Sequence, residues 1–176
     1  SKDYAQVMRK TKLKEENLWK NTLLFFLTDN GGSKAMEANN GSLRGYKGSL
    51  YEGGIRTPWI MSWPERFKGG RTINTPINSI DILPTVIDAT DSKVPEGTQF
   101  DGKSILPLVT GQSDSHHTNI FWNSGPPKRE WAVRQGNWKA HGLGEKYNLF
   151  NLVTDPSETQ DLATENPEKA SELFDL

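Results

Sequence analysis

The pattern of apolar and polar positions predicts two short strands near the start of the chain. Residues 22–28 run Thr-Leu-Leu-Phe-Phe-Leu-Thr and end at Asp29-Asn30-Gly31-Gly32. A short apolar run that ends in an acid, an amide and glycines is typical of a buried strand that delivers polar groups to a loop. Residues 55–63 have β character, with Pro58 and Pro64 as the bounds of a second strand.

Four segments carry the apolar spacing or the end signals of helices. An amphipathic pattern covers residues 4–20, and residues 77–89 repeat apolar side chains at helical spacing. Residues 104–109 predict a short helix or turn that ends at Gly111. Asn166 followed by Pro167 is a helix start, so a final helix is expected to run to about residue 175.

The composition changes after residue 112. A polar linker covers residues 113–117, and four short runs rich in aromatic and β-branched residues follow, separated by turns. These runs, at 119–122, 131–134, 138–141 and 147–151, predict a small antiparallel meander. We therefore expect an α/β part over residues 1–112 and a small antiparallel sheet with a terminal helix over residues 113–176.

Composition narrows the classes of function. The 176 residues have a net charge of -1, so the whole chain gives no electrostatic support for a nucleic-acid partner. No apolar run approaches the length that spans a membrane, and the start has no apolar signal core. The absence of cysteine excludes disulfides, thiolate metal sites and a Cys nucleophile within these residues. Because the sequence does not begin with Met, we expect a processed or cut piece of a longer protein.

Asp29 and Asn30 are the first candidate site residues. In open α/β sheets, ligands bind outside the carboxyl ends of the strands, which is where these two residues are expected. Carboxylate and amide oxygens suit Ca²⁺ or Mg²⁺, but two ligands cannot fill a Ca²⁺ shell, so others would have to come from elsewhere. The same four residues also suit an ordinary tight turn.

Lys47 is the second candidate. It lies in Gly45-Tyr46-Lys47-Gly48-Ser49, where a lysine among glycines suits an oxyanion such as sulfate or phosphate. The spacing is not that of a P-loop. A solvated loop lysine is the alternative.

The histidines offer little catalytic signal. His116 and His117 fall in the polar linker and are expected to be solvated, whereas His141, at the end of a predicted strand, could face a cleft or the surface. No local Ser/His/Asp arrangement with a nucleophile elbow is apparent. The Trp and Tyr residues of 119–151 are expected to pack the sheet, although one of them could line a pocket mouth.

An ordered set of short motifs resembles the type I sulfatases of the alkaline-phosphatase-like superfamily. The first is Thr28-Asp29-Asn30-Gly31, and the longest is the segment 43–58, Leu-Arg-Gly-Tyr-Lys-Gly-Ser-Leu-Tyr-Glu-Gly-Gly-Ile-Arg-Thr-Pro. The others, in chain order, are 63–64, 81–85, 101–108, 132–139, 148–152 and 155–156. Each piece is weak alone, but the ordered set covers nearly the whole chain.

The resemblance implies a fold and a site. The fold would be the C-terminal part of an alkaline-phosphatase-like sandwich, followed by the small antiparallel sheet and terminal helix. Asp29 and Asn30 match the family's acid–amide metal pair, usually for Ca²⁺, and Lys47 matches the lysine that contacts the sulfate. The metal and the lysine would offset charge on the sulfuryl and leaving oxygens. Family members are expected to be periplasmic or secreted.

The resemblance also implies what the chain would lack. The formylglycine nucleophile of the family is made from Cys or Ser in a Cys/Ser-x-Pro-x-Arg motif, and we expect that motif and the remaining metal ligands upstream of residue 1. The chain alone would then be inactive on sulfate esters. Two alternatives stay open: a phosphoesterase or phosphonate hydrolase of the same superfamily, and a non-catalytic module that binds a sulfated glycan.

Overall fold

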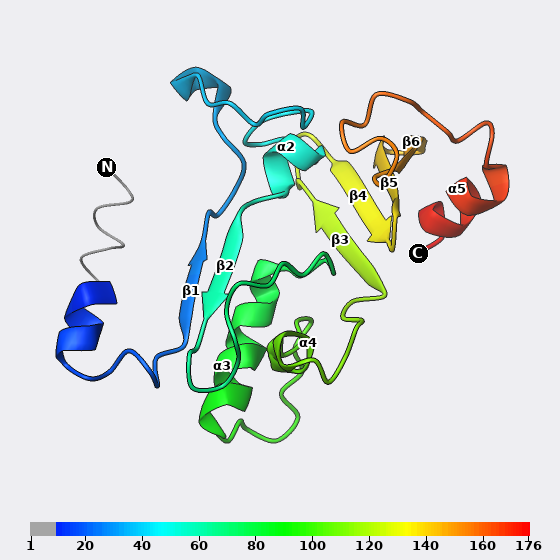
Figure 1. Cartoon of the computed structure of the whole chain (residues 1–176). Helices are drawn as coiled ribbons and strands as arrows, with labels where there is room; N and C mark the ends of the chain where they lie inside the picture. The colour runs from blue at the N-terminus through cyan, green and yellow to red at the C-terminus, as the bar shows by residue number, and fades with distance from the viewer. Residues whose placement is uncertain (1–9) are drawn as a thin grey trace. The chain divides into compact units, whose positions relative to one another are not determined.

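The computed structural model describes residues 10–176 (Figure 1). The chain forms two compact units, each built from two stretches of sequence. The first unit comprises residues up to 27 together with 58–116, and the second comprises 28–57 together with 117–176. Residues 28–57, which carry the candidate site residues, therefore belong to the same unit as the C-terminal sheet.

The first unit contains one antiparallel pair of strands and short helices. β1 (Leu24–Leu27) pairs with β2 (Trp59–Ser62), with Leu24 opposite Ser62 and Leu27 opposite Trp59. The helical elements that follow are η2 (Ser79–Asp81), α3 (Ile82–Thr90) and α4 (Leu106–Thr110). Ile105, Leu108 and Val109 form the core of this unit, with Trp59 and Met61 of β2 packed against them.

Buried polar groups fix the start of the helical segment. The side chain of Asn78 accepts from Ile80 N, and Asp81 Oδ2 accepts from Asn78 N at 2.7 Å, which is a capping box. Asp81 is fully buried, and its second oxygen accepts from Lys103 N at 2.9 Å. One carboxylate thus holds the helix start and the loop before α4 together.

The second unit is a four-stranded antiparallel meander with a helix on one face. The strands lie in sequence order and are β3 (Asn119–Asn123), β4 (Glu130–Gln135), β5 (Trp138–Leu143) and β6 (Lys146–Asn151). Gly136 and Gly144 have positive φ angles of 56° and 59° in the two hairpin turns, which is why those turns can be so short. The helices are η1 (Lys34–Met36), α2 (Glu52–Ile55) and α5 (Pro167–Phe174).

Alternation along the strands gives this sheet two different faces. Val133, Ala140 and Leu149 lie opposite one another and pack against Ala170 and Leu173 of α5, which Figure 1 shows beside the sheet. The neighbouring positions Arg134, Lys139 and Phe150 are also mutual partners, so they point to the opposite face. The α5 face is therefore the hydrophobic core, and the other face carries charge.

Most predicted elements are confirmed, with differences that have physical causes. The four strands of the meander, the terminal helix, the two short strands and the helices near 77–89 and 106–110 all form. The expected helix over 4–20 is helical at 10–15, ends before Asn17 at φ 59°, and lies partly outside the described residues. β1 was expected to be buried, but all four of its residues are only half-buried.

The sequence pattern also missed α2. Four residues with two central glycines have poor helix propensity and are too few to form an isolated helix. Tertiary contacts of Glu52, described below, hold it. No helix in the described part of the chain is long and apolar enough to cross a membrane.

The contact between α5 and the sheet generates a stability prediction. Leu173 is 1% exposed, so Leu173→Ala should lower the free energy of unfolding by about 2–5 kcal/mol, because it removes buried apolar atoms and leaves a cavity. Urea unfolding followed by circular dichroism measures the change. Val153→Ala, at a position 67% exposed, is the matched control and should change stability by less than about 0.5 kcal/mol. Equal losses in both variants would contradict this packing.

Candidate functional site

The two loops that carry the candidate residues are joined to each other through their backbones. Gly31 N donates to Gly54 O at 2.8 Å, and Lys47 N donates to Gly32 O at 3.0 Å. A third bond, from Gly53 N to Arg44 O at 2.7 Å, closes the second loop on itself. Two separate loops of the chain thus form one structure that carries Asp29, Asn30 and Lys47.

Glycine is required where the loops meet. A Cβ added to Gly31 would lie 1.8 Å from Gly53 O, and one added to Gly54 would lie 2.1 Å from Ser49 O. Both obstacles are backbone atoms, so a side chain at Gly31 would force the two loops apart, and one at Gly54 would distort the second loop. This close approach explains the Gly-Gly pairs in the sequence.

The side chain of Asn40 fastens the same two loops. Its Oδ1 accepts from Gly32 N at 2.9 Å, and its Nδ2 donates to Gly45 O at 3.0 Å. A spacing of five to eight residues carries no periodic signal, so only the folded loop reveals this clamp.

The candidate side chains themselves are accessible. Asp29 and Lys47 are exposed, and Asn30 is half-buried. Asn30 Nδ2 donates to Gly31 O at 2.8 Å, which fixes the amide and leaves its oxygen as an acceptor. The structure therefore brings the loops of all three residues together and keeps oxygen and ammonium groups available.

A buried charge network lies behind these loops. Lys139 of β5 is fully buried, and its Nζ lies 3.0 Å from Glu52 Oε1 and 2.8 Å from Glu158 Oε1. Glu52 is the first residue of α2, and Glu158 lies in the loop between β6 and α5. One lysine of the sheet thus holds two carboxylates from two separate loops.

Further contacts of Glu158 tie the site loop to this network. Its Oε2 accepts from Glu52 N at 2.6 Å, and its backbone oxygen accepts from Arg44 Nη1 at 2.7 Å. The backbone φ of Glu158 is 53°, a left-handed conformation that is costly for a residue with a side chain. Burial raises the pKa of Glu158, and the charge of Lys139 opposes that rise. The network therefore anchors the loop of Lys47 to the sheet through Arg44 and Glu52.

His141 lies in a cleft, which resolves the alternative left open by the sequence. Its side chain packs against Tyr51, with ring centroids 4.1 Å apart, and the residue is only 7% exposed. Burial lowers the pKa of His141 from 6.5 to about 4, and the nearby charges of Lys139 and Arg44 add to the effect. The imidazole is thus neutral at physiological pH.

The expectation that His116 is solvated is wrong. Its side chain is 4% exposed, and Nε2 lies 3.0 Å from Asp81 Oδ2. A polar linker can still be buried locally when a histidine meets a buried carboxylate, because the pair satisfies both groups. The sequence pattern gave no signal for this partner, which lies 35 residues away.

The expectation that the chain carries no Ser-x-Pro-x-Arg motif is also wrong. Ser62-Trp63-Pro64-Glu65-Arg66 has that spacing. Ser62 is the last residue of β2 and pairs with Leu24, the first residue of β1. The chain leaves β1 toward Asp29 at the opposite end of the strand, after Leu27. Arg66 stacks over the buried Trp63, whose Nε1 donates to Asn21 at 3.1 Å. These contacts make the segment a structural strand end.

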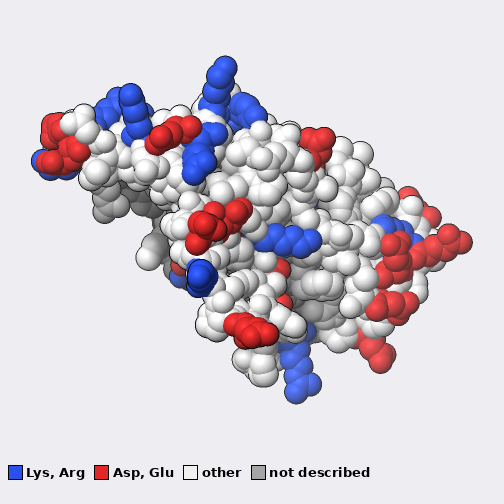
Figure 2. Space-filling model, turned by 90° about the horizontal axis from the view of Figure 1, so that it is seen from below, with Lys and Arg blue, Asp and Glu red and all other residues white. Residues whose placement is uncertain are grey.

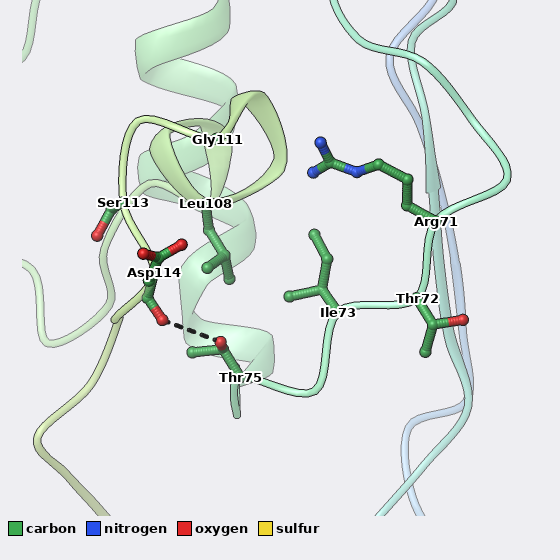
Figure 3. Close-up of a pocket in the computed structure, with 8 residues that line it drawn as sticks. All are labelled: Arg71, Thr72, Ile73, Thr75, Leu108, Gly111, Ser113 and Asp114. Atoms are coloured by element: carbon green, nitrogen blue, oxygen red, sulfur yellow. Dashed lines mark hydrogen bonds between the residues drawn. The ribbon is translucent and has the colours of Figure 1, made fainter.

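A separate pocket of about 510 Å³ lies in the first unit (Figure 3). Its lining contains none of the candidate residues. Arg71, which Figure 3 shows at its edge, donates from Nη2 to Val109 O at 2.9 Å, and Thr75 donates to Asp114 O. The guanidinium of Arg71 is therefore already hydrogen-bonded to the protein backbone. The lining residues are Arg71, Thr72, Ile73, Thr75, Leu108, Gly111, Ser113 and Asp114.

Surface charge agrees with the low net charge. Figure 2 shows basic and acidic side chains interspersed on one face, with acidic side chains gathered at its right-hand end. A nucleic-acid partner would need an excess of basic side chains, and the net charge of -1 gives no support for one.

Comparisons with known proteins decide the family. The model of the family described as Sulfatase matches residues 10–92, a segment that contains both candidate loops. Arylsulfatase H of Canis lupus familiaris is 31% identical over 202 residues, which cover 93% of this chain and 35% of that protein. The chain belongs to the sulfatase family. It spans about a third of the length of this relative.

Solved structures agree with the sulfatase fold. The crystal structure of Ps i-CgsB in complex with k-i-k-neocarrahexaose superposes with a TM-score of 0.84 and 30% identity, over 92% of this sulfatase chain and 36% of that chain. The phosphonate monoester hydrolase of Agrobacterium radiobacter gives a TM-score of 0.71 at 20% identity, over 93% and 35%. The second likeness shows the shared fold alone. The fold is the expected C-terminal part of an alkaline-phosphatase-like sandwich.

The buried network predicts a large effect of Lys139→Met. Removal of the lysine leaves two buried carboxylates without their cation, so we expect a loss of about 3–5 kcal/mol in the free energy of unfolding at pH 7. The triple variant Glu52→Gln, Lys139→Met, Glu158→Gln removes all three charges and should recover part of the loss. Lys93→Met, at an exposed position, is the control. If urea unfolding finds Lys139→Met and Lys93→Met equally stable, the network does not hold this unit.

The depressed pKa of His141 predicts a pH dependence of stability. Because the folded state binds this proton less readily than the unfolded state, the contribution of His141 is fully present above pH 6.5 and is lost as the pH falls toward 4. The loss amounts to up to about 3 kcal/mol, and His141→Gln should remove that component. An NMR titration of the imidazole checks the cause. A midpoint near 6.5 in the folded protein would contradict the burial argument.

Proposed function

We propose that this chain is part of an enzyme that hydrolyses sulfate esters, with Asp29 and Asn30 as two ligands of a Ca²⁺ ion and Lys47 as a sulfate-binding residue. The observation that carries the proposal is the joining of the two candidate loops by the Gly31–Gly54 and Lys47–Gly32 backbone bonds. Family membership supplies the reaction class, and these bonds supply a reason for the three residues to act together.

The donor set fits a hard divalent cation. Asp29 offers an exposed carboxylate, and Asn30 offers an amide oxygen whose NH₂ group is already bound to Gly31 O. Ca²⁺ prefers such oxygens and takes six to eight of them, so the remaining ligands would come from the rest of the protein. When bound, such an ion polarises the sulfate and offsets developing negative charge.

The setting of Lys47 supports an anionic ligand. It lies between Gly45 and Gly48, whose φ angles of 85° and 87° turn the loop sharply on both sides. The ammonium is exposed, and its own backbone is held by Gly32. A cation placed on a fixed loop can stabilise charge on the sulfuryl oxygens with little reorganisation.

The nucleophile is proposed to come from outside these residues. The chain has no cysteine, and Ser62 ends a structural strand, so neither supplies the formylglycine that the resemblance implies. We therefore infer that the 176-residue chain alone does not turn over sulfate esters and binds Ca²⁺ weakly. The substrate is proposed to be a sulfated glycan, and the location periplasmic or secreted.

Substitution of Lys47 tests the proposal in the complete protein that contains this chain. Lys47→Ala should lower kcat/KM for 4-nitrophenyl sulfate by about 10²–10³-fold, because a charge that stabilises the transition state is lost. Asp29→Ala should raise the Ca²⁺ concentration needed for half-maximal activity. Lys34→Ala, an exposed lysine of η1, is the control.

Three outcomes would overturn parts of the proposal. Unchanged kcat/KM in Lys47→Ala would remove the sulfate role of the lysine. A preference of the complete protein for a phosphonate monoester over the sulfate ester would favour the phosphonate hydrolase alternative. Turnover by the purified 176-residue chain would show that the nucleophile lies within it.

A further inference from the structure

The charged face of the C-terminal sheet is covered at one end and open at the other. Lys139 and Phe150 lie at the covered end, where Lys139 meets Glu52 and the Phe150 ring lies 6.3 Å from that of Tyr51. His141 is the next residue of β5 on the same face after Lys139, and it lies opposite Ala132 of β4 and Asn148 of β6. Beyond Tyr51, this open end forms a pocket of about 330 Å³. Its lining residues are Tyr51, Glu130, His141, Gly142, Leu143, Lys146, Tyr147 and Asn148.

Two buried polar atoms of this pocket have no partner among the described residues. They are Nε2 of His141 and Oε2 of Glu130. A buried polar atom without a hydrogen bond costs about 1–3 kcal/mol, so such atoms call for an explanation. Both belong to side chains that line the same pocket, which points to a ligand that reaches both.

The chemistry of the lining selects the ligand class. The carboxylate of Glu130 only accepts hydrogen bonds and repels anions, whereas a neutral imidazole can donate or accept. Burial raises the pKa of Tyr51, which keeps its hydroxyl protonated. The Tyr51 ring also contacts Arg44, whose guanidinium lies 3.9 Å from the ring centroid. A fixed aromatic ring beside one acceptor and one amphoteric group suits a ring that carries several hydroxyls.

Size and charge argue against simpler occupants. The pocket volume is roughly ten times the 30 Å³ of a single water, so one water cannot fill it. A sulfate group would meet the Glu130 carboxylate. The exposed Lys146 at the edge is the one cation of the lining and would face solvent.

We propose that the pocket of Tyr51, Glu130 and His141 binds an unsulfated, hydroxyl-bearing sugar ring of the substrate. The inference rests on the proposed function, since the ring would be the sugar portion of the sulfate ester that the enzyme hydrolyses. Tyr51 lies four residues after Lys47 on one loop, so the loop that holds the proposed sulfate ligand also supplies a wall of the sugar pocket.

NMR of the 176-residue chain tests the sugar pocket directly. The probes are D-galactose, N-acetyl-D-glucosamine and inorganic sulfate. At least one sugar should shift the imidazole signals of His141 in a saturable manner, whereas sulfate should not. His141→Phe keeps a ring beside Tyr51 and removes both nitrogens, so it should weaken that sugar by about tenfold, and Glu130→Gln should weaken it as well. Lys34→Ala, an exposed position of η1 that does not line the pocket, is the control and should leave sugar binding unchanged.

The outcomes separate this inference from the proposed function. If no sugar shifts His141, or if affinity survives in His141→Phe, the sugar pocket is overturned. A shift caused by sulfate and not by sugar would overturn it too. Sugar binding at His141, together with no turnover of 4-nitrophenyl sulfate by the complete protein, would support the pocket and overturn the proposed enzyme.

Discussion

Lys139 between Glu52 and Glu158 is the interaction on which the second unit depends. A fully buried lysine is expensive to desolvate, and its two carboxylate partners at 3.0 and 2.8 Å offset that cost. The three residues come from β5, from α2 and from the segment before α5. The same contact therefore stabilises a helix with two glycines and a left-handed Glu158, neither of which is favoured by its own sequence.

This anchor explains how exposed loops can carry a defined site. Asp29 and Lys47 are exposed, and exposed loops are ordinarily mobile. Here the loop of Lys47 is bound to the sheet by Arg44 and Glu52, and the loop of Asp29 is bound to that loop by backbone hydrogen bonds. Glycines at the junction make the approach sterically possible. The loops of the candidate residues are thus attached to the sheet, and fixed attachment is what preorganised electrostatics requires.

Local pattern was sufficient for regular elements and insufficient for the site. The meander and terminal helix were predicted because period-two alternation and an Asn-Pro helix start are local signals. The partners of His116, Lys139 and Asn40 were not, because a side chain's partner across the fold leaves no periodicity in the sequence. The Ser62 motif shows the converse, since its spacing matches a catalytic pattern while its place at the end of β2 gives it a structural role.

The sequence by itself determined the family, the C-terminal sheet and the identity of Asp29, Asn30 and Lys47 as candidates, because motif order and strand alternation are properties of the linear chain. Tertiary structure alone decided that residues 28–57 belong with the C-terminal sheet, that Lys139 is buried between two acids, and that His141 is neutral beside a pocket. Burial and long-range pairing set those properties, and both depend on which surfaces meet after folding.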